Sequence, residues 1–256
     1  MTSFIVPAWN EAGLVGATID AIHAACRALN EPYEVIVSDD GSTDETASVA
    51  DRHGARVVKV AHRQIAATRN SGAREARGEF FIFVDADTIV NETVVGAALE
   101  TLRKGAVGGG AAVGLDPHVP WYAKAMMPFF VVVFRTLGLA AGCFVFCTRS
   151  AFEAIGGFDE TYFGGEEIIF SRAMKQQGRF VVLRHAIMTS GRKLRTHSPI
   201  EVWAFMIRMA FRGPKGVRQR EGMDLWYAPR RPDPQNGGRV FRPGESAGPE
   251  GPASED

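Results

Sequence analysis

Charge of neither sign is in excess in this sequence, because 29 Lys and Arg residues balance 29 Asp and Glu residues. Proteins that bind nucleic acid usually carry a basic surplus, so no nucleic-acid partner is expected. Cysteine is scarce, with three in 256 residues, which argues against a disulfide framework. No basic and apolar leader precedes the strand-like run at Phe4, so we expect no secretory signal and a reducing, cytoplasmic location.

Long apolar runs are also few, and the most extended one covers residues 126–147. Arg135 lies near its centre, and Gly138 and Gly142 interrupt it. A charge at that depth of a bilayer is costly, which disfavours a membrane span. We predict a buried helix here, followed by a strand over residues 142–146.

Strand-like and helix-like segments alternate through the first hundred residues. Short runs rich in β-branched or aromatic residues occupy 4–6, 34–37, 56–60 and 80–84. Helical patterns occupy 13–29, 66–77 and 92–104, and another is expected to begin with Ser42 as its N-cap and end near Gly54. This alternation predicts an α/β fold with a mostly parallel central sheet flanked by helices.

Acidic residues follow three of the predicted strands, as Glu11, Asp39-Asp40 and Asp85-Ala86-Asp87. Parallel sheets bind ligands at the carboxyl ends of their strands. Crowded carboxylates need a cation or hydrogen-bond donors to stabilise them, and Mg²⁺ or Mn²⁺ with phosphate oxygens suits one or two carboxylates. Capping of helices and turns is the simpler interpretation of each acid taken alone. No G-x-G-x-x-G turn follows the first strand, which disfavours a dinucleotide-dependent oxidoreductase.

Five motifs in order resemble the family 2 glycosyltransferases. They are Val6–Glu11, Ser38–Asp44, Arg69–Gly72, Val84–Asp87, and Gly156–Glu160 followed by Gly165–Glu167. The resemblance implies a GT-A fold: a Rossmann-like nucleotide-binding half, about 1–105, fused to an acceptor-binding and catalytic half, 106–190. With a basic, aromatic helical segment over 191–228, these would form one domain of residues 1–228. The implied reaction is inverting transfer of a sugar from a nucleotide diphosphate sugar to an acceptor hydroxyl.

The resemblance also implies roles for single residues on the donor side. Pro7, Ala8 and Glu11 would contact the nucleoside. Asp40 would hydrogen-bond the base, and Asp39 would support the turn. Arg69 would lie near the diphosphate, where it could instead pair with an acid. Asp87 would bind the divalent metal, Mg²⁺ or Mn²⁺, and Asp85 would face the ribose or the metal.

Glu166 and Glu167 begin a predicted helix that ends near Gln177. The helix N-terminus favours their ionised form, so one of them is a candidate general base that takes the proton of the acceptor hydroxyl. The resemblance favours Glu167, although the family usually has Asp at this position. Support of the helix start is the alternative role for both glutamates.

The later part of the chain leaves the acceptor open. Arg192 follows a predicted strand over 180–183 and would clamp the diphosphate or lie in a solvated loop. Residues 192–220 are basic and aromatic, which suits either peripheral contact with the inner membrane surface or a packed helix. The acceptor is therefore expected to be lipid-linked or a soluble small molecule. Residues 229–256 are rich in proline and glycine and are expected to be disordered.

Two other functions fit parts of this pattern. A sugar nucleotidyltransferase would share the α/β scaffold, but Pro7–Glu11 lacks the glycine-rich phosphate loop that it needs. A catalytically inactive, membrane-peripheral protein that binds nucleotide sugars would keep the pocket. The glutamate pair argues against this second alternative.

Overall fold

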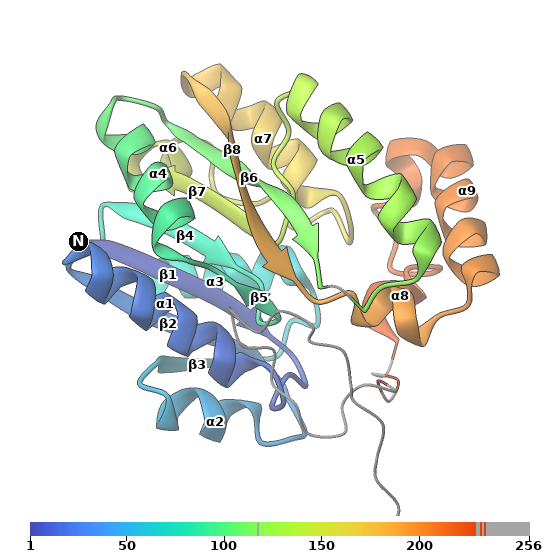
Figure 1. The fold of residues 1–256 in the computed structure, drawn as a ribbon, viewed down its shortest axis with the longest axis horizontal. Coiled ribbons are helices and arrows are strands. Elements are labelled where there is room, and N and C mark those ends of the chain that lie inside the picture. The colour runs from blue at the N-terminus through green and yellow to red at the C-terminus, as the bar shows by residue number, and fades with distance from the viewer. Residues whose placement is uncertain (117, 229–230, 232, 234–256) are drawn as a thin grey trace, which may run out of the picture.

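The computed structural model describes residues 1–116, 118–228, 231 and 233. Within this part of the chain, eight strands form one sheet in the order β3-β2-β1-β4-β7-β6-β8-β5 (Figure 1). The strands are β1 (Thr2–Ala8), β2 (Tyr33–Asp40), β3 (Arg56–Val60), β4 (Phe80–Val84), β5 (Thr88–Ile89), β6 (Gly108–Leu115), β7 (Phe144–Thr148) and β8 (Phe180–Thr189).

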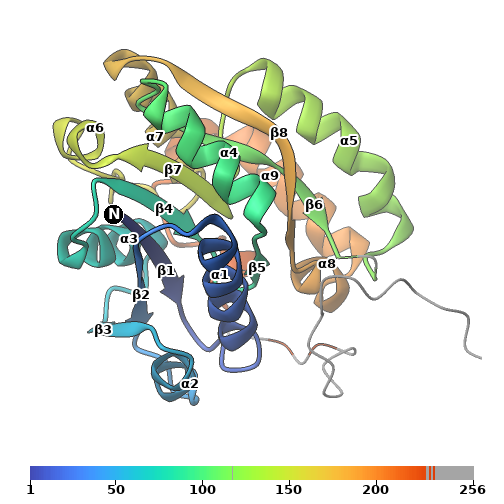
Figure 2. The same ribbon diagram turned by 60° about the vertical axis from the view of Figure 1, so that its left-hand side comes forward.

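The described residues also form ten helices, of which the last three follow the final strand. They are α1 (Val15–Leu29), α2 (Thr46–Arg52), α3 (Ile65–Glu75), α4 (Glu92–Arg103), α5 (Trp121–Thr136), α6 (Arg149–Ala154), α7 (Glu166–Gln177), α8 (Arg192–Thr196), α9 (Pro199–Gly216) and α10 (Asp224–Tyr227). Two apolar clusters pack α1 and α4 on one face of the sheet and α3, α6 and α7 on the other (Figures 1 and 2). The predicted arrangement of helices on both faces is confirmed.

The sheet is mostly parallel, as predicted. β1, β2, β3 and β4 pair in parallel, and so do β6 and β8, whereas β7 runs antiparallel to both β4 and β6. Along β1, Phe4 packs in one apolar cluster and Ile5 in the other, because successive side chains point to opposite faces. The carboxyl ends of β1, β2, β4, β6 and β8 consequently lie along one edge of the sheet.

Two local expectations are wrong. Ser42 does not cap a helix: its hydroxyl accepts a hydrogen bond from the Asn10 N–H, and α2 begins only at Thr46. The apolar run 126–147 does not form a buried helix, because Val132 of α5 and Leu137 at its C-terminal cap are 59% and 57% exposed. An apolar composition favours a helix but does not ensure that another element covers it. The strand expected after this helix is present as β7.

The C-terminal segment differs from its prediction in part. The strand predicted over 180–183 continues to Thr189, and residues 192–220 form two helices, α8 and α9, instead of one. In the described part of the chain, no helix is long and apolar enough to cross a membrane. The predicted tail lies outside the described residues apart from Arg231 and Asp233, which form ion pairs with Glu201 and Arg195.

Candidate active site

Arg69 lies at the centre of the candidate site, on the second turn of α3. Its side chain is 1% exposed. Nη1 donates to Oε1 of Glu166 at 2.7 Å, and Nη2 donates to Oδ1 of Asp85 at 2.9 Å and to the carbonyl of Gly142 at 2.8 Å. A buried charge is tolerated only when it is paired and hydrogen-bonded. The guanidinium therefore joins the end of β4, the loop before β7 and the start of α7.

Glu166 and Glu167 are the first two residues of α7, after Gly165 in the left-handed conformation (φ 68°). Glu166 is held by Arg69, whereas the carboxylate of Glu167 lies beside Gly142, where a Cβ atom would be 3.6 Å from its Cδ. Burial, together with the charge of Glu166, raises the pKa of Glu167 well above its usual range, although Arg69 opposes this shift. The helix N-terminus favours the ionised form of this side chain, as expected, whereas burial and the neighbouring acids act in the opposite direction.

Asp85 and Asp87 follow β4 and are both partly exposed, while Ala86 between them is buried. Both aspartates thus reach the surface, and they lie close enough for the charge of Asp87 to act on Asp85. Burial raises the pKa of Asp85, against the effect of Arg69, and the charge of Asp87 adds to the increase. Oδ1 of Asp87 accepts only a long hydrogen bond of 3.4 Å from the Thr189 hydroxyl, and its carbonyl accepts from the Ser190 N–H.

No set of three His, Cys, Asp or Glu side chains in the described residues is arranged to hold a metal ion. The two aspartates nevertheless fit a divalent cation of the kind that binds one or two carboxylates together with phosphate oxygens of its substrate. Their mutual repulsion, which contributes to the raised pKa of Asp85, is the kind of interaction that a cation offsets.

Asp40, at the end of β2, holds the N-terminal end of α3. Oδ1 accepts hydrogen bonds from the N–H groups of His62 and Arg63 at 2.6 and 2.8 Å, and Oδ2 accepts from the N–H of Gln64 at 3.1 Å and the hydroxyl of Thr68 at 2.8 Å. The base contact that the resemblance implies for Asp40 would need one of these donors to move. Asp39 accepts from the Ser42 N–H at 3.3 Å, which agrees with its expected role in supporting the turn.

Glu11 and Arg192 pair with each other, although 181 positions separate them. The guanidinium donates two hydrogen bonds, of 2.8 and 2.5 Å, to the two carboxylate oxygens. The exposed fractions of Glu11 and Arg192 are 5% and 9%. Glu11 was expected to contact the nucleoside of the sugar donor, and Arg192 its diphosphate. Their contact with each other, which joins the end of β1 to the start of α8, was not predicted.

A cavity lies beside this group of residues, next to the ends of β1 and β2. Its lining includes Pro7, Ala8 and Asp40, as expected for a nucleoside pocket, together with Trp9, Arg63, Gln64, Ile65, Thr68, Lys193, Trp226 and Tyr227. The Arg63 guanidinium stacks on the Trp9 ring at 3.4 Å from its centroid. The sequence analysis did not identify Arg63, Trp226 or Tyr227 as site residues. For Trp226 and Tyr227, the only available signal was that two aromatic residues stand next to each other in a polar segment.

Replacing Arg69 by Met would leave Asp85 and Glu166 without their cation. We expect the free energy of unfolding near neutral pH to fall by about 3–5 kcal/mol, the usual cost of breaking a buried ion pair. The loss should shrink as the pH falls: in the variant the folded-state pKa of these carboxyls lies above the unfolded value, so protonation favours the folded form. Urea denaturation at about pH 7.5 and about pH 5 measures both effects.

Arg56→Met is the matched control, because Arg56 pairs with Glu34 and Glu75 at the surface and is 35% exposed. An exposed pair contributes about 0–1 kcal/mol. Equal losses in the two variants, or a loss for Arg69→Met that does not change with pH, would contradict the central role of Arg69.

Known proteins resemble this chain in both sequence and fold. Validoxylamine A glucosyltransferase of Streptomyces hygroscopicus subsp. jinggangensis is 28% identical over 216 residues, which cover 66% of this chain and 50% of that protein. Dolichyl-phosphate beta-glucosyltransferase of Drosophila melanogaster is 29% identical over 225 residues, which cover 82% of this chain and 61% of that protein. The chain spans about half the length of the first of these relatives and three fifths of the second.

The fold matches that of a mannosyltransferase from Pyrobaculum calidifontis, solved in complex with GDP-Man and Mn²⁺, with a TM-score of 0.64 and 19% identity. This match covers 88% of the present chain and 66% of the other. It confirms the predicted α/β fold of the GT-A type. The family model of glycosyl transferase family 2 matches residues 3–156, more than half of the chain, and the chain therefore belongs to this family.

Proposed function

We propose that this protein is a metal-dependent, inverting glycosyltransferase that moves a sugar from a nucleotide diphosphate sugar to an acceptor hydroxyl. The observation that carries the proposal is the meeting of Asp85 and Glu166 on the buried guanidinium of Arg69, with Asp87 and Glu167 beside them. Acids from the end of β4 and the start of α7 thus face the sheet edge where α/β proteins bind nucleotides. The names of the relatives, both glucosyltransferases, support the same activity.

The donor would lie between the cavity at Pro7, Ala8 and Asp40 and the carboxylates of Asp85 and Asp87. A divalent cation, Mg²⁺ or Mn²⁺, bound by Asp87 with the help of Asp85 would supply positive charge to the departing nucleotide diphosphate. Arg192 would add a second positive charge. Glu11 fixes its guanidinium through two hydrogen bonds, and Arg192 is close enough to Asp87 for the acid to raise the pKa of the arginine.

Glu167 is the better candidate for the general base of the two glutamates. Glu166 is fixed by Arg69, whereas in the described part of the chain no other side chain bonds the carboxylate of Glu167, which lies beside Gly142. Its raised pKa suits a group that takes a proton from the acceptor hydroxyl and then holds it. Arg69 bonds both Asp85, on the proposed donor side, and Glu166, next to the candidate base. It would therefore fix the distance between the sugar donor and Glu167.

Nucleotide diphosphates should stabilise the folded protein when Mn²⁺ is present. A ligand at one hundred times its dissociation constant adds about 2.7 kcal/mol to the free energy of unfolding. We expect a clear rise in melting temperature with UDP or GDP, and a much smaller rise in Asp87→Ala because that variant loses the carboxylate that would bind the cation. Asp51→Ala, at an exposed position of α2, is the control and should respond as the wild type does. If no nucleotide diphosphate stabilises the wild type, the proposed donor class is wrong.

Glu167→Gln should bind the donor as the wild type does, because the substitution keeps the size of the side chain. Its turnover number should fall by about 10²–10⁴, the usual contribution of a general base. The wild-type turnover number should rise with pH above the ordinary glutamate range, since the base works only when deprotonated and its pKa is raised. The variant should lose this dependence.

Sugar transfer or donor hydrolysis at fixed Mn²⁺ measures both effects. Full activity of Glu167→Gln would assign the proton transfer to another group. If the wild type binds nucleotide sugars with Mn²⁺ but neither transfers nor hydrolyses them, the catalytically inactive binding protein is the correct alternative.

We propose further that α9 contacts a membrane surface that presents a lipid-linked acceptor. Ile200, Trp203 and Ile207 of this helix are 80%, 47% and 52% exposed, and Arg208 beside them is exposed too. Helix α5 lies on the same side of Figure 1 as α9, and its Val132 is also exposed. Bulky apolar side chains next to a cation suit the interface of an anionic bilayer. The name of the Drosophila relative, which acts on dolichyl phosphate, supports this choice over a soluble acceptor.

The wild type should co-sediment with vesicles that contain anionic lipid, and less with neutral vesicles or at high salt, because part of the attraction is electrostatic. The double variant Trp203→Ala, Ile207→Ala should sediment much less. Asp51→Ala is again the control. A wild type that stays in the supernatant at low salt would point to a soluble acceptor.

A further inference from the structure

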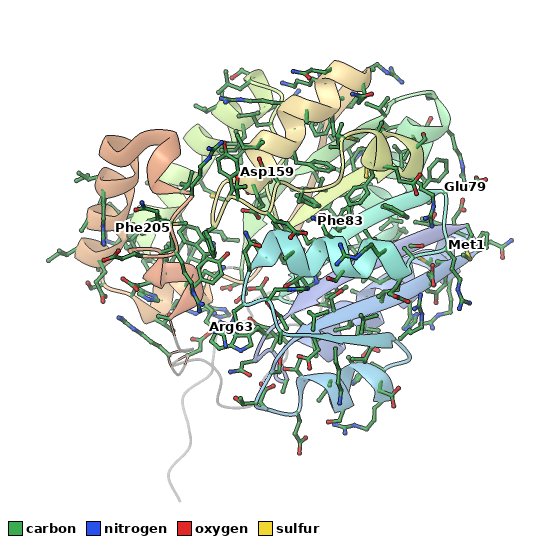
Figure 3. All side chains as sticks on the ribbon, turned by 180° about the vertical axis from the view of Figure 1, so that it is seen from behind. Met1, Arg63, Glu79, Phe83, Asp159 and Phe205 are labelled. Carbon is green, nitrogen blue, oxygen red and sulfur yellow. The ribbon has the colours of Figure 1, made fainter. Side chains whose placement is uncertain are left out.

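The cavity beside Pro7 and Ala8 is lined on one side by residues that lie far along the chain, in and after α8. Lys193, Trp226 and Tyr227 complete its lining. Its volume is about 90 Å³, whereas pockets that enclose small-molecule ligands measure about 300–1,000 Å³. Figure 3 places the orange C-terminal segment, with Phe205, beside the loop that carries Arg63. The space between these side chains is smaller than a nucleoside, so a bound nucleoside would extend beyond the cavity or displace part of its lining.

The segment that forms this wall is fixed to the loop before Glu166. The Phe163 N–H donates to the carbonyl of Val217 at 2.7 Å, and Arg218 donates to the Tyr162 hydroxyl at 2.8 Å. Met223 is 2% exposed and packs on Gly164, where a Cβ atom would be only 2.2 Å from the methionine Cε. The anchor holds α10 in place, and its flexible methionine contact allows a small displacement.

The two aromatic side chains of α10 lie differently. The Trp226 ring, 37% exposed, packs against Phe205 at 4.7 Å between centroids and lies below the Lys193 ammonium at 5.7 Å. Tyr227 meets Phe163 edge to face at 5.8 Å. Its hydroxyl is buried near the backbone of Ile65 at the start of α3, without the geometry of a hydrogen bond. A buried hydroxyl without a partner costs free energy, which a ligand can recover by bonding to it.

We propose that Trp226 and Tyr227 bind the nucleoside of the donor, with the Trp226 ring stacked on the base and the Tyr227 hydroxyl bonded to a polar atom of the nucleoside. The inference rests on the proposed function, and it adds a wall of the donor site from outside the residues that match the family model, 3–156. Stacking suits this position because every base has a face that an aromatic ring can cover. The cation of Lys193 lies where it can approach the attached phosphates.

Three variants test this assignment by calorimetric titration of UDP and GDP in the presence of Mn²⁺. Trp226→Ala should bind about tenfold more weakly, in the range of the loss of one base stack, and Trp226→Phe should stay close to the wild type. Tyr227→Phe should bind severalfold more weakly, yet its melting temperature without nucleotide should be equal or higher, because it removes an unpaired buried hydroxyl. If Tyr227 only supported the fold, the substitution would not weaken nucleotide binding while leaving the melting temperature equal or higher.

Trp121→Ala is the matched control, since Trp121 lies on α5, is 81% exposed and does not line the cavity. Its affinity should equal that of the wild type. Wild-type affinity in Trp226→Ala and Tyr227→Phe would overturn the inference while leaving the proposed function intact. Tighter nucleotide binding in these variants would also overturn it, because it would show that α10 blocks the cavity. If the wild type itself binds no nucleotide diphosphate, the proposed function fails and this assignment fails with it.

Discussion

The need to neutralise one buried cation sets the geometry of the site. Arg69 is almost fully shielded from water, and protein groups meet both of its terminal nitrogens: Asp85 after β4, Glu166 at the start of α7 and the carbonyl of Gly142. Such an arrangement adds little net stability compared with an apolar core. Its effect is positional, because it ties the loop that carries Asp85 and Asp87 to the helix that begins with Glu166 and Glu167.

The place of the site could be predicted from the sequence, since strand ends collect at one edge of a parallel sheet. Asp40, Asp87 and Glu167 were expected to converge on one crevice. The structure joins Asp85 and Glu166 through Arg69, with Glu167 beside them, whereas Asp40 is engaged at the start of α3. The contact of Glu11 with Arg192 could not be predicted. It depends on the return of β8 alongside β5, which follows from the packing of the whole sheet and from no local pattern.

Local rules failed where burial decided the outcome. A helix N-terminus favours a carboxylate by about 0.3–1 kcal/mol, which is less than one pKa unit, so it cannot offset the burial of Glu167 among other acids. The apolar sequence of α5 likewise does not reveal that Val132 remains at the surface. Trp226 and Tyr227 carry no motif at all, and only the folded chain places them at the cavity of Pro7 and Ala8.

Asp40 places α3 mainly through the backbone. Three of its four donors are backbone N–H groups of residues 62–64, which every amino acid except proline supplies. A substitution at Arg63, which lines the cavity of Pro7 and Ala8, therefore leaves these hydrogen bonds available. The lining of the cavity can vary at this position while α3, and Arg69 with it, keeps its place.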